Sequence, residues 1–130
     1  MSGETNLGLI LNTLKPELNA GEYVFCCVDK GDLAIDNIIG LFKEKEGWTM
    51  VLEKSAADER QLKYDGIFAW ITLTVHSSLN GVGLTAAFSN ALAKADIGCN
   101  VIAGFYHDHL FVPKGQEIRA LEALQRLSAV

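Results

Sequence analysis

The sequence predicts an α+β fold in which helices pack on one face of mixed, largely antiparallel β-sheets. Two observations predict it. Short strand-like runs alternate with segments of helical spacing along the whole chain, and the second half follows the order strand, helix, strand, strand, helix. With 130 residues, of which 49% are hydrophobic, the chain is long enough to bury a core.

The first segments combine a helix, a turn and a strand. Apolar residues at helical spacing predict a helix over residues 7–14, which Pro16 ends. Asn19-Ala20-Gly21 is typical of a turn. The β-rich run over residues 22–28 then predicts a buried strand.

A second helix and strand complete the first half. Residues 33–43 carry apolar side chains at helical spacing, and residues 48–52 form a strand-like run. Ser55 is a suitable N-cap for a short helix with acidic residues in its first turn. We expect Tyr64-Asp65-Gly66 to form the turn that ends this helix.

The second half has the stronger patterns. Residues 68–75 alternate large apolar residues with threonines, as a strand does. The next helix has an apolar stripe at i, i+3, i+4, i+7, i+8 and i+11, formed by Leu84, Ala87, Phe88, Ala91, Leu92 and Ala95. Gly98 is expected to end that helix. Strands over 99–106 and 110–112 follow, joined through His107-Asp108-His109.

The final helix spans residues 115–127, with its apolar side formed by Ile118, Leu121, Ala123, Leu124 and Leu127. The second half is therefore a split β-α-β unit of the ferredoxin-like type, with its last strand between the other two. A strand from the first half, over 22–28 or 48–52, should fill the sheet edge beside the first strand. We expect two halves, residues 1–66 and 67–130.

Composition excludes several partners. The net charge is −5 and the 11 Lys and Arg residues are scattered, so we expect no nucleic-acid binding. No apolar run approaches the ~20 residues of a membrane-spanning helix, and the N-terminus does not resemble a signal peptide. The three cysteines do not suggest a disulfide framework, so we expect a cytoplasmic protein with reduced thiols.

The segment between the strand over 68–75 and the next helix is the candidate ligand site. A helix N-terminus offers unpaired N–H groups and partial positive charge, which suit a small anion. The candidate residues of this loop are His76, Ser77, Ser78, Leu79, Asn80, Gly81, Val82, Gly83, Leu84 and Thr85. Asn100, His107 and Asp108 are further candidates at the same polar edge.

Two other chemistries compete for these residues. His76, His107 and His109 could converge on zinc with Asp108 as an oxygen donor, although hairpin turns break the alternation that this requires. Residues 81–86 fit the G-x-G-x-x-A pattern of dinucleotide sites, but the glycines follow the strand too late and the chain is too short for that fold. We therefore expect no metal, no cofactor and no catalytic residue.

The stretch from Gly81 to Gly104 resembles the ACT domain pattern, through Gly83-Leu84, Ala91-Leu92-Ala93 and Gly98. Two longer segments, LTVHSSLNGVGLTAA and YHDHLFVP, are similar to an uncharacterised bacterial family of tandem ACT-like domain proteins. LKPELNAGEYVF and EGWTMVLEKSAAD in the first half are similar to the same family. The second half is also distantly similar to aspartokinase-type ACT domains and to cytosolic arginine sensors.

The resemblance implies a tandem ferredoxin-like fold and a regulatory role. ACT domains commonly bind amino acids at interfaces between paired domains, so it implies an amino acid or similar metabolite as ligand and a homodimer or higher homo-oligomer. The loop over 76–83 would contact the ligand. The expected function is a small non-catalytic sensor. The alternatives are a protein–protein interaction module without a ligand and, ranked lower, a metal-binding protein.

Overall fold

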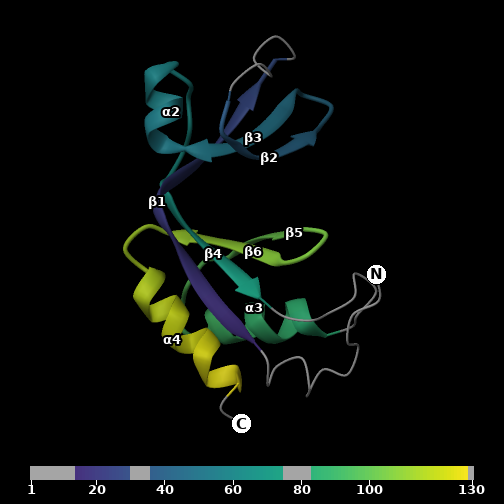
Figure 1. The fold of residues 1–130 in the computed structure, drawn as a ribbon, viewed down its shortest axis with the longest axis vertical. Helices are drawn as coiled ribbons and strands as arrows, with labels where there is room; N and C mark the ends of the chain where they lie inside the picture. The colour runs from purple at the N-terminus through teal and green to yellow at the C-terminus, as the bar shows by residue number, and fades with distance from the viewer. Residues whose placement is uncertain (1–13, 30–35, 75–82, 129–130) are drawn as a thin grey trace. The chain divides into compact units, whose positions relative to one another are not determined.

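The computed structural model describes residues 14–29, 36–74 and 83–128. The chain divides into two compact units, drawn in Figure 1. Unit 1 comprises residues 1–20 and 69–130, and unit 2 comprises Gly21–Phe68. Strand β1 (Lys15–Val28) contributes its first residues to unit 1 and the rest to unit 2. The expected division at residues 66 and 67 stays a prediction.

Four strands form the sheet of unit 1, in the order β1-β4-β6-β5. They are the first part of β1, then β4 (Phe68–Thr74), β6 (Asp108–Pro113) and β5 (Asn100–Ala103). β5 and β6 are antiparallel. The predicted position of the last strand between the other two is confirmed, and a strand from the first half does lie beside β4.

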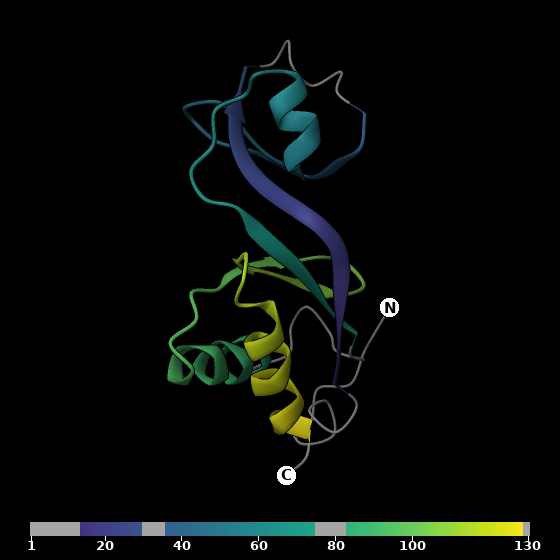
Figure 2. The same cartoon turned by 90° about the vertical axis from the view of Figure 1, so that its left-hand side faces the viewer.

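Helices α3 (Leu84–Lys94) and α4 (Glu117–Ser128) lie on the same side of this sheet (Figures 1 and 2). β4 alternates as predicted: every second residue is fully buried toward the helices, and the intervening ones are half-buried. The core contains Ala69, Ile71, Leu73, Phe88, Leu92, Leu110, Val112, Ala120 and Leu124, each with no exposed surface. Each large member contributes about 1.5–3 kcal/mol by leaving water.

The end of α3 differs from the prediction. The helix ends at Lys94, and Asp96 rather than Gly98 has the left-handed conformation, with φ of 62°. The amide of Ile97 donates to the Leu92 carbonyl at 2.9 Å, and the amide of Asp96 donates to the Ala93 carbonyl at 3.0 Å. This pair of hydrogen bonds is a Schellman motif, in which Ile97 packs into the core beside Leu92.

Helix α4 has a slightly different apolar side from the predicted one. Ile118 is 62% exposed, whereas Ala120 is completely buried. The predicted contribution of Ile118 to the core is therefore wrong. The other expected positions, Leu121, Ala123, Leu124 and Leu127, all belong to or contact the core of unit 1.

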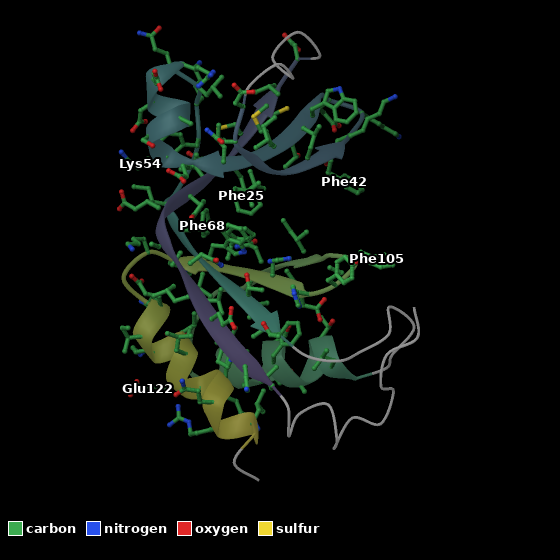
Figure 3. The ribbon with its side chains drawn as sticks, in the orientation of Figure 1. Phe25, Phe42, Lys54, Phe68, Phe105 and Glu122 are labelled. Atoms are coloured by element: carbon green, nitrogen blue, oxygen red, sulfur yellow. The ribbon has the colours of Figure 1, made fainter. Side chains whose placement is uncertain are left out.

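The described part of unit 2 contains a three-stranded antiparallel sheet and one short helix. Its strand order is β2 (Ile38–Lys43), β3 (Trp48–Glu53) and then β1. Helix α2 (Lys54–Glu59) follows β3 directly and buries Ala57 against this unit's core. That core is formed by Val24, Cys26, Val28, Met50, Leu52 and Ala57. Phe25 and Phe68 pack edge to face, with ring centroids 5.4 Å apart (Figure 3).

Three predictions for the first half are wrong. Residues 19–21 lie inside β1, where Gly21 takes a φ of 111° that suits glycine. Residues 38–43 form a strand and not a helix, since they pair with β3. Glu53, not Ser55, precedes the first turn of α2, and Asp58 and Glu59 lie in its last turn. The helix predicted over 7–14 lies outside the described residues.

No helix in the described part of the chain is long and apolar enough to cross a membrane.

Candidate functional site

The predicted ligand loop is only partly described. His76, Ser77, Ser78, Leu79, Asn80, Gly81 and Val82 lie outside the described residues, while residues 83–85 are described. Gly83 is the N-cap of α3, with a left-handed φ of 95°, and its carbonyl accepts the Ala87 amide at 2.9 Å. Because glycine has no side chain, the N-cap itself cannot satisfy the amides of the first turn. These donors therefore suit an anion at the start of α3.

The turn between β5 and β6 is closed by close backbone contacts. The Gly104 amide donates to the His107 carbonyl at 2.9 Å. A Cβ atom at position 104 would lie only 2.8 Å from that oxygen, so the turn requires glycine there. His107 is half-buried, and its Nδ1 atom is buried without a hydrogen-bond partner among the described residues. A buried imidazole nitrogen in this state is destabilising unless something else bonds to it.

Asp108 is the first residue of β6 and lies opposite Ala103. The pair two positions along the ladder, Val101 with Leu110, faces the core, so Asp108 lies on the same, helix-covered face. Burial raises the pKa of the half-buried Asp108 carboxyl, and the neighbouring His109 and His107 partly offset this. A cationic partner would stabilise its ionised form.

The strand topology brings some of the predicted site residues to one edge of the sheet and places Asn100 away from that edge. β4 and β5 flank β6 and are joined through α3, so they are parallel and end at the same edge. His107 and Asp108, which lie just before and at the start of β6, belong to this edge. Asn100 begins β5 and is therefore about 10 Å away along the strand. Its side chain donates to the Phe111 carbonyl at 3.3 Å.

A second polar cluster lies on the sheet face opposite the helices. Trp70 Nε1 donates to His109 Nδ1 at 3.0 Å, and Thr72 Oγ1 lies 3.3 Å from the same nitrogen. Asn19 Nδ2 in turn donates to Thr72 Oγ1 at 2.9 Å. The Trp70 ring also stacks on Phe111, with centroids 6.1 Å apart. This cluster connects β1, β4 and β6, and sequence reasoning did not find it.

The geometry fixes the protonation state of His109. An indole N–H can only donate, so His109 Nδ1 must accept and the ring must be neutral with its proton on Nε2. Burial, and secondarily the charge of His107, lowers the pKa of His109, and Asp108 raises it by less. His109 is therefore a structural acceptor here and is not available through Nδ1 as a metal ligand.

No cluster of histidine, cysteine, aspartate or glutamate among the described residues could hold a metal ion. The rings of His107 and His109 are nearly perpendicular, with centroids 6.5 Å apart. The part of the zinc hypothesis that involves His76 lies outside the described residues. No disulfide links Cys26, Cys27 or Cys99.

Two of the surface hollows in the described part of the chain lie away from residues 83–85, His107 and Asp108. One of about 350 Å³ lies between α3 and α4 and is lined by four alanines together with Asn90, Lys94, Arg126 and Leu127. The other, of about 300 Å³, lies in unit 2 beside Lys54 and Asp58, which form an ion pair of 2.7 Å. Neither is lined by residues 83–85, His107 or Asp108.

Comparison with known proteins supports the ferredoxin-like assignment. The chain is 48% identical to a Vibrio cholerae protein of unknown function, described as a possible transport protein, with a TM-score of 0.85 over 94% of this chain and 95% of that one. The regulatory subunit of aspartate kinase from Thermus thermophilus is 10% identical and shares the fold, with a TM-score of 0.55 over 88% of this chain and 95% of that one. A comparison with curated protein sequences gives no match.

Two ACT domain models match the chain in succession. One covers residues 2–69 and the other residues 68–126, so that together they span nearly the whole sequence. A pair of aspartokinase α and β subunits gives a similar likeness of fold, at 11% identity and a TM-score of 0.61 over 88% of this chain and 97% of that one. The chain therefore belongs to the ACT domain family, as a tandem of two ACT domains.

Proposed function

We propose that the protein is a non-catalytic sensor that binds an amino acid, or a similar small metabolite, at the sheet edge formed by the start of α3 and the β5–β6 turn. Membership of the ACT family supports a regulatory small-ligand-binding module in general. The similarity in fold to aspartate kinase regulatory subunits agrees with this. The three unpaired cysteines are consistent with the reducing cytoplasm.

The observation that carries the ligand proposal is the buried Nδ1 atom of His107, which has no hydrogen-bond partner among the described residues. Buried polar atoms are nearly always satisfied, and each exception calls for an explanation such as a missing ligand. A bound molecule with a polar group at this edge would supply the missing bond. The next residue, Asp108, is half-buried, and burial raises its pKa.

The charges at this edge support a zwitterionic ligand. The first-turn amides of α3 have no N-cap side chain and no acidic residue beside them, which favours a carboxylate. The Asp108 carboxyl favours an ammonium group, because a cation would offset the cost of its burial. An α-amino acid carries both groups a few ångströms apart.

Thermal unfolding with each of the twenty amino acids tests the proposal. A ligand at a hundred times its Kd should add about 2.7 kcal/mol to the free energy of unfolding. Asp108→Asn should abolish this stabilisation, because the amide cannot neutralise an ammonium group. Asp65→Asn, which changes an exposed carboxyl in unit 2, is the matched control and should respond like the wild type.

The proposal is wrong if no amino acid at millimolar concentration stabilises the wild type. A full response from Asp108→Asn would remove Asp108 from the site. Comparable loss in Asp65→Asn would show that the response depends on overall charge.

A further inference from the structure

Helices α3 and α4 lie side by side on one face of the unit 1 sheet (Figures 1 and 2), and a hollow of about 350 Å³ lies between them. This volume is at the lower end of the range of small-molecule sites, which is about 300–1,000 Å³. The hollow shares no residue with the start of α3 over 83–85 or with the β5–β6 turn. Binding in the hollow would therefore be separate from binding at the sheet edge proposed for an amino acid.

The floor of the hollow is apolar because small residues meet there. Ala87, Ala91 and Ala95 follow one another at intervals of four residues on α3, and Ala123 lines the same hollow from α4. All four are buried or half-buried. An alanine side chain ends at Cβ, so alanines on both helices leave space that larger side chains would fill. The result is an open site whose floor favours a hydrocarbon over water.

Positive charge accompanies this apolar floor. Lys94 of α3 and Arg126 of α4 line the hollow, and no acidic side chain does. Neither cation forms an ion pair with another described residue. Arg119 adds a third cation beside the hollow, where its guanidinium donates to the Ala95 carbonyl. The chain has a net charge of −5, so this local excess of cations is opposite in sign to the charge of the whole molecule.

The helix dipoles explain only part of this arrangement. Lys94 and Arg126 each lie in the last turn of a helix, where a cation is favourable in itself. A cation in the last turn has this benefit on any side of the helix. The dipoles therefore do not explain why both cations line the same apolar hollow, whereas an anionic ligand in the hollow does.

We propose that this hollow binds a small organic carboxylate with an unbranched apolar chain. The chain would lie on the alanine floor, and the carboxylate would lie between Lys94 and Arg126, whose long side chains can close on it. An inorganic anion would leave the floor exposed to water. A zwitterionic amino acid would place its ammonium group among cations. A carboxylate with a hydrocarbon chain complements both the floor and the charges.

Titration of the isotope-labelled protein with sodium octanoate tests the proposal. Octanoate at millimolar concentration should shift the backbone amide resonances of residues 87–95 and 123–127 and leave those of unit 2 unchanged. From butanoate to octanoate, each added methylene should tighten binding by up to about fourfold, because each one leaves water. Absence of these shifts, equal affinity across the series, or equal shifts with inorganic phosphate would overturn the proposal.

A variant of the floor locates the site. Ala91→Leu fills the hollow from α3 and should abolish the octanoate shifts. Ala93→Leu makes the same change on the exposed side of α3, and this matched control should bind octanoate like the wild type. If Ala91→Leu binds as tightly as the wild type, the hollow is not the site. Should Ala91→Leu fail to fold, the chain-length series on the wild type decides the question.

A second pair of variants tests the charges. Lys94→Gln and Arg126→Gln should each weaken octanoate binding by up to about fivefold, as expected for a carboxylate paired with an exposed cation. Lys63→Gln, which removes an exposed cation of unit 2, is the control for overall charge and should not weaken binding. Full affinity in both Lys94→Gln and Arg126→Gln, or an equal loss in Lys63→Gln, would contradict the proposed position of the carboxylate.

Discussion

Replacing His109 tests the hydrogen bond that connects β4 to β6 in unit 1. Its Nδ1 atom accepts the Trp70 indole N–H at 3.0 Å, and both side chains are half-buried. His109→Phe removes the acceptor and leaves the indole N–H without this partner. The expected loss at pH 8 is about 1–3 kcal/mol of unfolding free energy, which is the usual cost of an unsatisfied buried donor.

A double-mutant cycle isolates this bond from the packing of the ring. Trp70→Phe removes the donor, so His109→Phe should cost at least about 1 kcal/mol less in that background than in the wild type. Chemical unfolding followed by circular dichroism measures all four proteins. If the two costs agree within about 0.5 kcal/mol, the Trp70–His109 hydrogen bond contributes nothing measurable and the reasoning is refuted.

The same residue predicts a pH dependence whose sign follows from its lowered pKa. In the unfolded chain His109 gains a proton near pH 6.5, whereas the folded state, in which Nδ1 is occupied, gains it only at lower pH. The unfolded state therefore binds more protons just below pH 6.5. The contribution of His109 to the free energy of unfolding is fully present above pH 6.5. On acidification below that pH it falls by at most about 1.4 kcal/mol per pH unit.

His109→Asn is the comparison for the pH series, because an amide oxygen can accept the indole N–H but does not titrate. The difference in unfolding free energy between the wild type and His109→Asn should be constant above pH 7 and should become smaller below pH 6.5. Asp108 and His107 adjoin His109, and both are present in the two proteins. Fluorescence of Trp70 in a Trp48→Phe background reports on unit 1 alone, since the chain has two tryptophans. If the unfolding free energies of the wild type and His109→Asn change with pH by the same amount, the pKa of His109 is not lowered.

Two further predictions concern packing and thiol reactivity. Leu92→Ala should cost about 2–5 kcal/mol in chemical unfolding, because the Leu92 side chain is fully buried, whereas Ala93→Ser on the exposed side of α3 should change stability by less than about 0.5 kcal/mol. A thiol-specific chromogenic reagent at pH 8 should modify the exposed Cys27 quickly and Cys99 slowly, because burial raises the pKa of Cys99 to about 11; equal rates at both would contradict this.

The second half of the fold could be predicted from sequence because its local patterns agree with its packing. β4 alternates between core and opposite face, and the apolar stripe of α3 supplies Phe88 and Leu92 to the core. Local propensity, periodicity and tertiary burial select the same elements there, which is the condition under which sequence patterns are informative.

In the first half, local patterns and tertiary structure disagree. Asn19, Ala20 and Gly21 resemble a turn, yet they lie inside β1. The side-chain amide of Asn19 donates hydrogen bonds to the Trp70 carbonyl and to Thr72 Oγ1, and these bonds connect this segment to β4. The apolar residues of β2 have helical spacing, yet Ile39 and Phe42 are exposed and do not form a buried helical face. An edge strand lacks the one-sided burial that produces clean alternation, so spacing was misleading here.

The candidate ligand site stays a prediction, and its sequence basis is chain order alone. The order strand, loop, helix predicts that the N-terminus of α3 follows the end of β4, and this requires no knowledge of register. The Trp70–His109 cluster, in contrast, joins residues that are 39 positions apart. It could have been anticipated only from the polar half of the β4 alternation, Trp70 and Thr72, together with the order β1-β4-β6.

Register also explains why His107, Asp108 and His109 have three different environments despite being consecutive. His107 closes the turn with Gly104, Asp108 pairs with Ala103 on the helix-covered face, and His109 pairs with Ile102 on the opposite face. A shift of one residue in this pairing would exchange the faces of Asp108 and His109. The carboxyl would then meet the Trp70 indole, and the imidazole would face the helices. The chemistry of this edge is therefore set by the β5–β6 pairing, which the close approach at Gly104 fixes and which composition and spacing alone do not encode.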